Sequence, residues 1–283
     1  MGVLLWLAAG PALAVPLWKV EGEAGTVFLL GSIHALTPDH YPLPARVKRV
    51  YERADRVVFE VDLTRLSQPE MAAITREYGA YRPPRTLQTE LSDETLAALS
   101  GYLERRRLTM QEVNTVKPWL LALQISIREL QRAGYNPAFG LDMHLMQRAI
   151  GDGKQLGELE TFREQMSALS ADPPAVQELA LREVIDGLDG FDAELKEMIT
   201  AWEDADIDAL YQMAVEMVEE EPALGPQVER IVHERNDRMV ESIVGLLEAE
   251  GTTLVVVGAL HLGGDRGIIS LLSRDFEVTE ITE

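Results

Sequence analysis

The stretch Thr26–His34, TVFLLGSIH, has a counterpart far downstream in Thr253–His261, TLVVVGALH. Each consists of a short apolar run, then Gly, two further residues and His. Apolar runs that are rich in β-branched residues and stop at Gly are typical of buried strands in a sheet covered on both faces. The two stretches therefore predict two interior strands of one α/β sheet, one from each end of the chain.

The Gly and His of each stretch predict where a site would lie. Gly31 and Gly258 lack a Cβ, so the backbone can turn sharply after each strand. His34 and His261 then follow the carboxyl ends of the two strands, which is where open α/β sheets bind their ligands. Because Gly-x-x-His is a short pattern, the alternative is two unrelated strand ends, each with a solvated or hydrogen-bonded His.

A carboxylate in the next apolar segment is the third candidate. Val57–Val61, within the sequence RVVFEVD, is predicted to be a strand with Glu60 inside it or at its end. An unpaired buried charge is costly, so we expect Glu60 to be paired, protonated or bound to a metal. The alternative is that Glu60 faces solvent on an edge strand or pairs with a nearby Arg such as Arg56.

The remaining sequence predicts an α/β (α+β) fold in a single domain of residues 15–283. Leu17–Glu21 is expected to form a hairpin with the strand that follows it. The chain from about residue 66 to residue 248 is predicted to be largely helical, with a short strand within residues 153–160. A final strand is expected at Phe276–Ile281. Because strand, Gly-x-x-His, helix and strand occur in this order at both ends, we expect a pseudo-repeat that forms a central mixed sheet, with the helical segment inserted between its halves.

Composition excludes several classes of function. The chain has 47 acidic and 26 basic residues, a formal net charge of −21. Nucleic acids and anionic membrane surfaces are therefore poor partners. The acidic balance would favour a metal cation or a basic substrate; the alternative is that most of these charges form a solvated surface. There is no Cys, which excludes disulfides, zinc-thiolate sites and a Cys nucleophile.

The N-terminal segment Met1–Ala14, MGVLLWLAAGPALA, resembles a secretory signal peptide. It has an apolar centre and ends in an Ala-x-Ala pattern, although the usual basic start is missing. It is too short to span a bilayer unaided. We therefore expect an exported, periplasmic protein whose mature chain begins near Val15 and has no stable membrane span; the alternative is a buried N-terminal helix.

Two His and one Glu, once brought together by such a sheet, suffice for either of two chemistries. They could bind a divalent cation with an open position at which water is acidified. They could also work without metal, with Glu60 orienting a His that acts as a general base on water. The sequence contains no Gly-x-Ser-x-Gly, His-Glu-x-x-His, P-loop or dinucleotide-binding motif, so serine hydrolases, zincins, NTPases and dehydrogenases gain no support.

Six segments together resemble the TraB/GumN family, which is related to the Tiki proteins and more distantly to ChaN-like proteins and erythromycin esterases. They are LLGSIHAL, VVFEVD, GLDMHLMQRA, LGELETFREQ, HERNDRM and VVVGALHLGGDRGI, in this order along nearly the whole mature chain. The resemblance implies an α/β fold with a large helical region and a site built on the two Gly-x-x-His motifs. In the Tiki relatives such a site belongs to a manganese- or cobalt-dependent protease, and in the esterase branch similar residues open a lactone ring.

The resemblance also implies roles for single residues. His34 and His261 fall on the paired motif histidines, and Glu60 falls on the family's acidic residue after the second strand. These three are the implied catalytic residues and the implied ligands of a divalent metal such as manganese or cobalt.

Further motif positions are matched outside the paired turns. Arg235 falls on the family's Arg near the C-terminal helix, where it would stabilise developing negative charge. The polar sequence around it predicts a surface Arg; the alternative is a Coulombic partner for buried carboxylates. Asn236 is its neighbour and a further candidate, while Asp142 and Glu160 match motif positions whose role the resemblance does not assign.

These observations lead to one principal hypothesis and two alternatives. The principal hypothesis is an exported, divalent-metal-dependent hydrolase, a Tiki-like peptidase acting on a peptide or small-molecule substrate. The first alternative is a non-catalytic periplasmic binding or accessory protein of envelope polysaccharide export. The second is a metal-independent His/Glu esterase.

Overall fold

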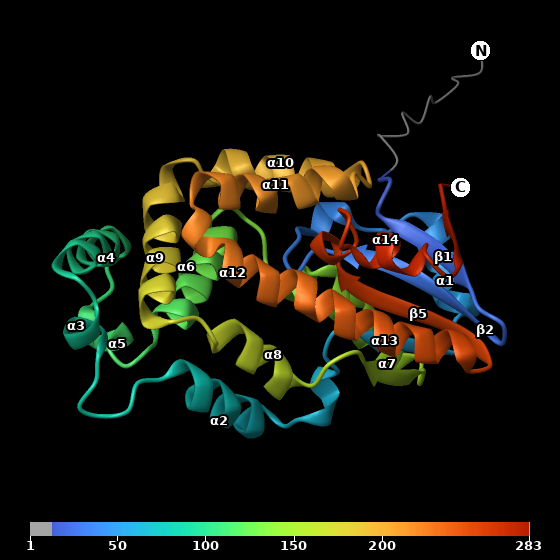
Figure 1. Cartoon of the computed structure of the whole chain (residues 1–283), viewed down its shortest axis with the longest axis horizontal. Helices are drawn as coiled ribbons and strands as arrows, with labels where there is room; N and C mark the ends of the chain where they lie inside the picture. The colour runs from blue at the N-terminus through green and yellow to red at the C-terminus, as the bar shows by residue number, and fades with distance from the viewer. Residues whose placement is uncertain (1–12, 283) are drawn as a thin grey trace, which may run out of the picture.

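The computed structural model describes residues 13–282, which contain a six-stranded sheet in the order β4-β3-β5-β2-β1-β6 (Figure 1). The strands are β1 (Leu17–Glu21), β2 (Gly25–Ser32), β3 (Arg56–Phe59), β4 (Gln155–Glu158), β5 (Gly251–Gly258) and β6 (Glu277–Glu280). Strands β4, β3, β5 and β2 run parallel, while β1 is antiparallel to both β2 and β6. The predicted central mixed sheet is therefore confirmed.

The two strands predicted from the paired motifs, β2 and β5, lie side by side in the middle of the sheet. Ser32 pairs with Gly258, and Gly31 pairs with Val257. The register of the two strands thus offsets the two motifs by one residue. Because side chains alternate between the faces of a strand, equivalent motif residues point to opposite faces of the sheet.

One face of the sheet is covered by α1 (Ala45–Arg53), α7 (Leu141–Gly151) and α10 (Phe191–Glu203). Their apolar side chains form one core with Phe28 and Leu30 of β2 and with Leu254 and Val256 of β5. Trp202 of α10 is fully buried and donates its indole N–H to the carbonyl of Gly31 at 3.0 Å. This bond ties α10 to the first motif.

The opposite face is covered by α13 (Glu234–Glu248) and α14 (Ile268–Leu272). Met239, Ile243 and Leu247 follow one another every four residues, so they form one apolar stripe along α13. This stripe packs on the alternate side chains of β2 and β5. In Figure 1, α13 runs along the sheet in front of β5.

A helical arm extends away from the sheet and has a core of its own. It is built from α3 (Leu87–Glu90), α4 (Asp93–Arg106), α5 (Met110–Val113), α6 (Pro118–Arg132) and α9 (Pro174–Asp186). Helix α2 (Gln68–Gly79) packs on α8 (Phe162–Ser170), and α11 (Ile207–Glu220) packs on α10 and on the short α12 (Gly225–Val228). Figure 1 shows α3, α4 and α5 farthest from the sheet. The predicted helical insertion between the two halves is therefore confirmed.

Two details refine the predicted boundaries. The strand predicted at Val57–Val61 ends at Phe59, so Glu60 follows the strand instead of lying inside it. None of the helices within residues 13–282 is long and apolar enough to span a bilayer. The predicted signal peptide, residues 1–14, lies outside the described residues except for its last two, and Val15 is fully buried.

Candidate active site

The ends of β2, β3 and β5 bring three of the predicted residues together around Gly258. A Cβ built at Gly258 would lie 3.1 Å from Glu60 Oε1, 3.5 Å from His261 Cδ2 and 3.7 Å from His34 Nε2. The missing side chain thus leaves the space in which the three groups face one another. The two motifs are neighbours in one sheet and not unrelated strand ends.

Glu60 is buried, with 8% of its surface exposed, and both of its carboxylate oxygens are bonded. Gly258 N–H donates to Oε1 at 2.6 Å, and Arg235 Nη2 donates to Oε2 at 2.6 Å. Burial alone would raise the pKa of Glu60, but the charges of His261, His34 and Arg235 and the Gly258 N–H outweigh it and lower this pKa to about 2. Glu60 is therefore an anion at neutral pH.

Arg235 lies at the centre of the buried cluster and uses all of its donors there. Nε and Nη2 bond Glu160 at 3.0 and 2.5 Å, and Nη2 also bonds Glu60. Nη1 donates to the carbonyl of Ile231 at 3.0 Å and to Nε2 of His261 at 3.1 Å. A guanidinium has five N–H donors, so none is left for a substrate while these bonds persist.

A π-helical turn, Glu229–His233, precedes α13 and helps to place Arg235. Such turns are wider than α-helical ones and are frequent at functional sites. The bond from Arg235 to Ile231 anchors the guanidinium to this turn. Arg235 and the next residue, Asn236, are both buried, at 6% and 0% exposed.

The hydrogen bond from Arg235 Nη1 to Nε2 determines the tautomer of His261. Because a guanidinium is always a donor, Nε2 of His261 must accept, and the ring proton sits on Nδ1. Nδ1 donates to Asn236 Oδ1 at 2.6 Å, and the Asn236 amide donates in turn to the carbonyl of Arg266 at 2.8 Å. Burial, together with the charges of Arg235 and His34, outweighs the charge of Glu60 and lowers the pKa of His261 to about 4. His261 is therefore neutral, and both of its nitrogens are bonded.

His34 has the opposite character. Its side chain is 67% exposed, and Nδ1 pairs with Asp142 Oδ2 at 3.2 Å. Desolvation opposes protonation, but the hydrogen bond and charge of Asp142, with the charge of Glu60, outweigh it and raise the pKa of His34 to about 9. Solvent screens part of this effect because the ring is exposed.

Some of these contacts could not be predicted from the sequence. The pairing of His34 with Asp142 depends on the first turn of α7, where Leu141 N–H donates to the carbonyl of Ile33. In the sequence, Asp142 stands out only by its motif position. Glu160, another residue with no assigned role, follows β4 and is the bidentate partner of Arg235. No pattern in the sequence signals the π-helical turn.

The contacts of Arg56 and His144 place both side chains outside the cluster. Arg56, a possible partner of Glu60, instead donates to Thr253 Oγ1 at 2.7 Å and to the carbonyl of Glu250 at 2.8 Å. His144 lies on α7 and packs against the ring of Tyr41, with ring centroids 4.3 Å apart.

Comparison with known proteins supports the resemblance carried by the six segments. The model of the TraB/PrgY/gumN family matches residues 16–280. The chain belongs to this family. It is also 26% identical over 141 residues to YbaP of Escherichia coli (strain K12) and to YbaP of Shigella flexneri. The match covers 50% of this chain and 50% of each relative, so the chain spans about half the length of the curated relatives it matches. No solved structure matches the chain.

The resemblance to metal-dependent relatives implies a divalent cation at this site. The arrangement of the side chains shows whether they could bind one. Within residues 13–282, no three His, Asp or Glu side chains are grouped so that they could hold one metal ion. The lone pairs that a metal would need on Glu60, Glu160 and His261 accept hydrogen bonds from Arg235. As arranged here, these residues do not fit a divalent cation.

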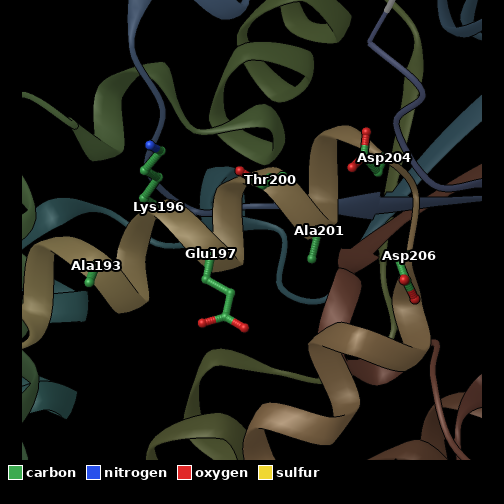
Figure 2. A pocket seen from close by; sticks show the side chains of 7 residues that line it. All are labelled: Ala193, Lys196, Glu197, Thr200, Ala201, Asp204 and Asp206. Atoms are coloured by element: carbon green, nitrogen blue, oxygen red, sulfur yellow. The ribbon is translucent and has the colours of Figure 1, made fainter.

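A separate open pocket of about 450 Å³ lies along α10 and the loop that joins α10 to α11 (Figure 2). Figure 2 shows the side chains that line it; they are Ala193, Lys196, Glu197, Thr200, Ala201, Asp204 and Asp206. None of these residues belongs to the cluster around Gly258. The candidate active site is therefore defined by its converging polar groups and not by this pocket.

Proposed function

We propose that this member of the TraB/PrgY/gumN family is an exported hydrolase of peptide or ester bonds in which His34 activates water. One observation carries the proposal. Within residues 13–282, Nε2 of His34 makes no hydrogen bond, and it faces the space at Gly258 while Asp142 holds the opposite nitrogen. A base must have such a free lone pair within reach of a substrate.

The other acidic and basic groups of the cluster are poor candidates for the base. Glu60 has a pKa of about 2 and both oxygens bonded, so it has little affinity for a proton. His261 has a pKa of about 4 and no free nitrogen. The carboxylate of Glu160 accepts all of its hydrogen bonds from Arg235. These groups act as positioning residues that set the field around His34.

The proposed step follows from this arrangement. With the proton of neutral His34 on Nδ1, donated to Asp142, Nε2 takes a proton from water as the water oxygen bonds to the carbonyl carbon of the substrate. The C=O π electrons move to the carbonyl oxygen. When they return, the bond to the leaving nitrogen or oxygen breaks, and Nε2 gives the proton to that atom. The negative charge of Glu60 favours the transient imidazolium.

The pKa of His34 predicts the pH dependence of this reaction. The base form is neutral, so at pH 7 a pKa raised toward 9 leaves most molecules protonated and inactive. We expect turnover to rise with pH and to level off between the ordinary His value of 6.5 and the shifted value of about 9.

The test compares His34→Gln with the wild type on a panel of p-nitrophenyl esters and fluorogenic peptides. We expect kcat to fall roughly 10²–10⁴-fold, the usual contribution of a general base, with an unchanged thermal unfolding midpoint. His144→Gln is the matched control, because His144 lies on α7 beside Asp142 but outside the cluster. Wild-type kcat in His34→Gln would contradict the proposal. No turnover by the wild type on any substrate would favour the binding or accessory function instead.

A further inference from the structure

The cluster around Arg235 contains the types of side chain that bind metals, but they are arranged around a guanidinium. Glu60 Oε2, Glu160 Oε1 and His261 Nε2 all point at one guanidinium, with N–O and N–N distances of 2.6, 2.5 and 3.1 Å. Two carboxylates and one neutral imidazole form a common set of ligands for a divalent cation. Here each of these ligands accepts an N–H instead.

We propose that the Arg235 guanidinium occupies the place in this donor set that a divalent cation would take. The positive charge that holds the two carboxylates is thus built into the fold. The Ile231 carbonyl of the π-helical turn accepts a hydrogen bond from Nη1 and thereby fixes one edge of the guanidinium.

The charges of the buried side chains are consistent with Arg235 serving as the cation of the cluster. Glu60 and Glu160 are 8% and 7% exposed, and a buried carboxylate is retained only when it is paired. Arg235 supplies one positive charge to the two. A divalent ion placed beside the guanidinium would meet its repulsion and would have to displace its hydrogen bonds, so Arg235 excludes metal as well as replacing it.

The inference predicts that metal binding can be uncovered by removing Arg235. The double variant Arg235→Ala/Glu160→Gln takes out one positive and one negative charge, so the net charge of the cluster is unchanged. It frees lone pairs on Glu60 and His261, which lie around Gly258 together with the already free Nε2 of His34. We expect Mn²⁺ at 100 times its Kd to raise the thermal unfolding midpoint of this variant by about 5–10 °C. The EDTA-treated wild type should show no shift.

Arg266→Ala is the matched control. Arg266 also holds two acidic side chains, Glu229 and Asp237, but its own side chain is 38% exposed and no His completes the set. This variant should gain no Mn²⁺ affinity by titration calorimetry. A folded double variant that binds no Mn²⁺ would overturn the proposal.

Metal analysis of the purified wild type tests the same inference without any variant. We expect less than about 0.1 equivalent of any transition metal and no change of the unfolding midpoint in EDTA. A stoichiometric metal, or a midpoint that EDTA lowers, would overturn the proposal even if the double variant does not fold. Because these readouts involve no substrate, they are independent of the hydrolase proposal.

Discussion

The two Gly-x-x-His turns share their Gly and His, but the environments of the two imidazoles are opposite. His34 is 67% exposed at its side chain, has a raised pKa and keeps one nitrogen free. His261 is 6% exposed, has a lowered pKa and has both nitrogens bonded. The motif therefore determines where the imidazole lies. Its pKa and its free nitrogen atoms depend on the side chains that surround it.

The register of the sheet explains how the two turns diverge. Because Ser32 and not Gly31 pairs with Gly258, the two motif glycines point to opposite faces of the sheet. β2 continues one residue past its Gly, while β5 ends at its Gly and passes directly into the 3-10 turn Ala259–His261. His261 is thereby directed to α13 and His34 to the first turn of α7.

Loss of the Arg235 guanidinium should have the largest effect on the free energy of unfolding. Arg235→Met leaves Glu60 and Glu160 buried without their common partner, and breaking a buried ion pair costs about 3–5 kcal/mol. We expect urea unfolding to show a decrease of this size in the free energy of unfolding. Arg163→Met is the control, because its pair with Glu77 is exposed and worth about 0–1 kcal/mol. Equal losses in the two variants would show that the cluster is not a structural centre.

Replacing each His by Phe should separate the two turns directly. His261→Phe keeps a ring but leaves Asn236 Oδ1 and one N–H of Arg235 unpartnered, at a cost of about 1–3 kcal/mol. His34→Phe changes an exposed side chain and should alter the free energy of unfolding by no more than about 0.5 kcal/mol. Calorimetric midpoints of both variants test this, and a larger loss in His34→Phe would reverse the assignment.

Acidification should destabilise the fold through His261 before it affects Glu60. The pKa of His261 is lowered from 6.5 to about 4, so its stabilisation is complete above pH 6.5 and is lost as the pH falls through 4. The pKa of Glu60 is lowered from 4.5 to about 2, so its stabilisation is lost only below pH 4.5. Between pH 6.5 and 4.5 we expect the free energy of unfolding to fall by at most about 1.4 kcal/mol per pH unit from this one group. Denaturant titrations at pH 7, 6 and 5 measure the slope, which should be smaller by this amount in His261→Phe.

The sheet and the residues that meet at its edge could be predicted from the sequence, and the physical reasons are clear. Apolar runs stopped by Gly can be recognised locally, and parallel neighbours must end at the same edge, so the sequence alone predicts that His34, Glu60 and His261 lie near one another. The opposite characters of the two imidazoles could not be predicted. They depend on a one-residue register offset and on a π-helical turn that aims Arg235, and neither has a local sequence signal.

The smallest expected effect on stability is that of replacing Asp142. This replacement tests whether Asp142 raises the pKa of His34. Asp142→Asn removes the charge beside His34 but keeps a hydrogen-bonding group, so the pKa of His34 should fall from about 9 toward its ordinary value of 6.5. Because a raised pKa stabilises the folded state fully below pH 6.5 and loses this effect as the pH rises through 9, the variant should differ in stability from the wild type only below about pH 9. An exposed pair is worth about 0–1 kcal/mol, so the change in stability should be near the limit of detection.

Proton NMR titration of His34 in the wild type and in Asp142→Asn measures this shift at the ring itself. The His261 resonance in the same spectra is an internal reference, since its partners are Asn236 and Arg235 and not Asp142. If His34 titrates identically in both proteins, the difference between the two turns arises from the field of Glu60 and not from the hydrogen bond to Asp142. The proposed base would then depend on β3 instead of α7 for its activation.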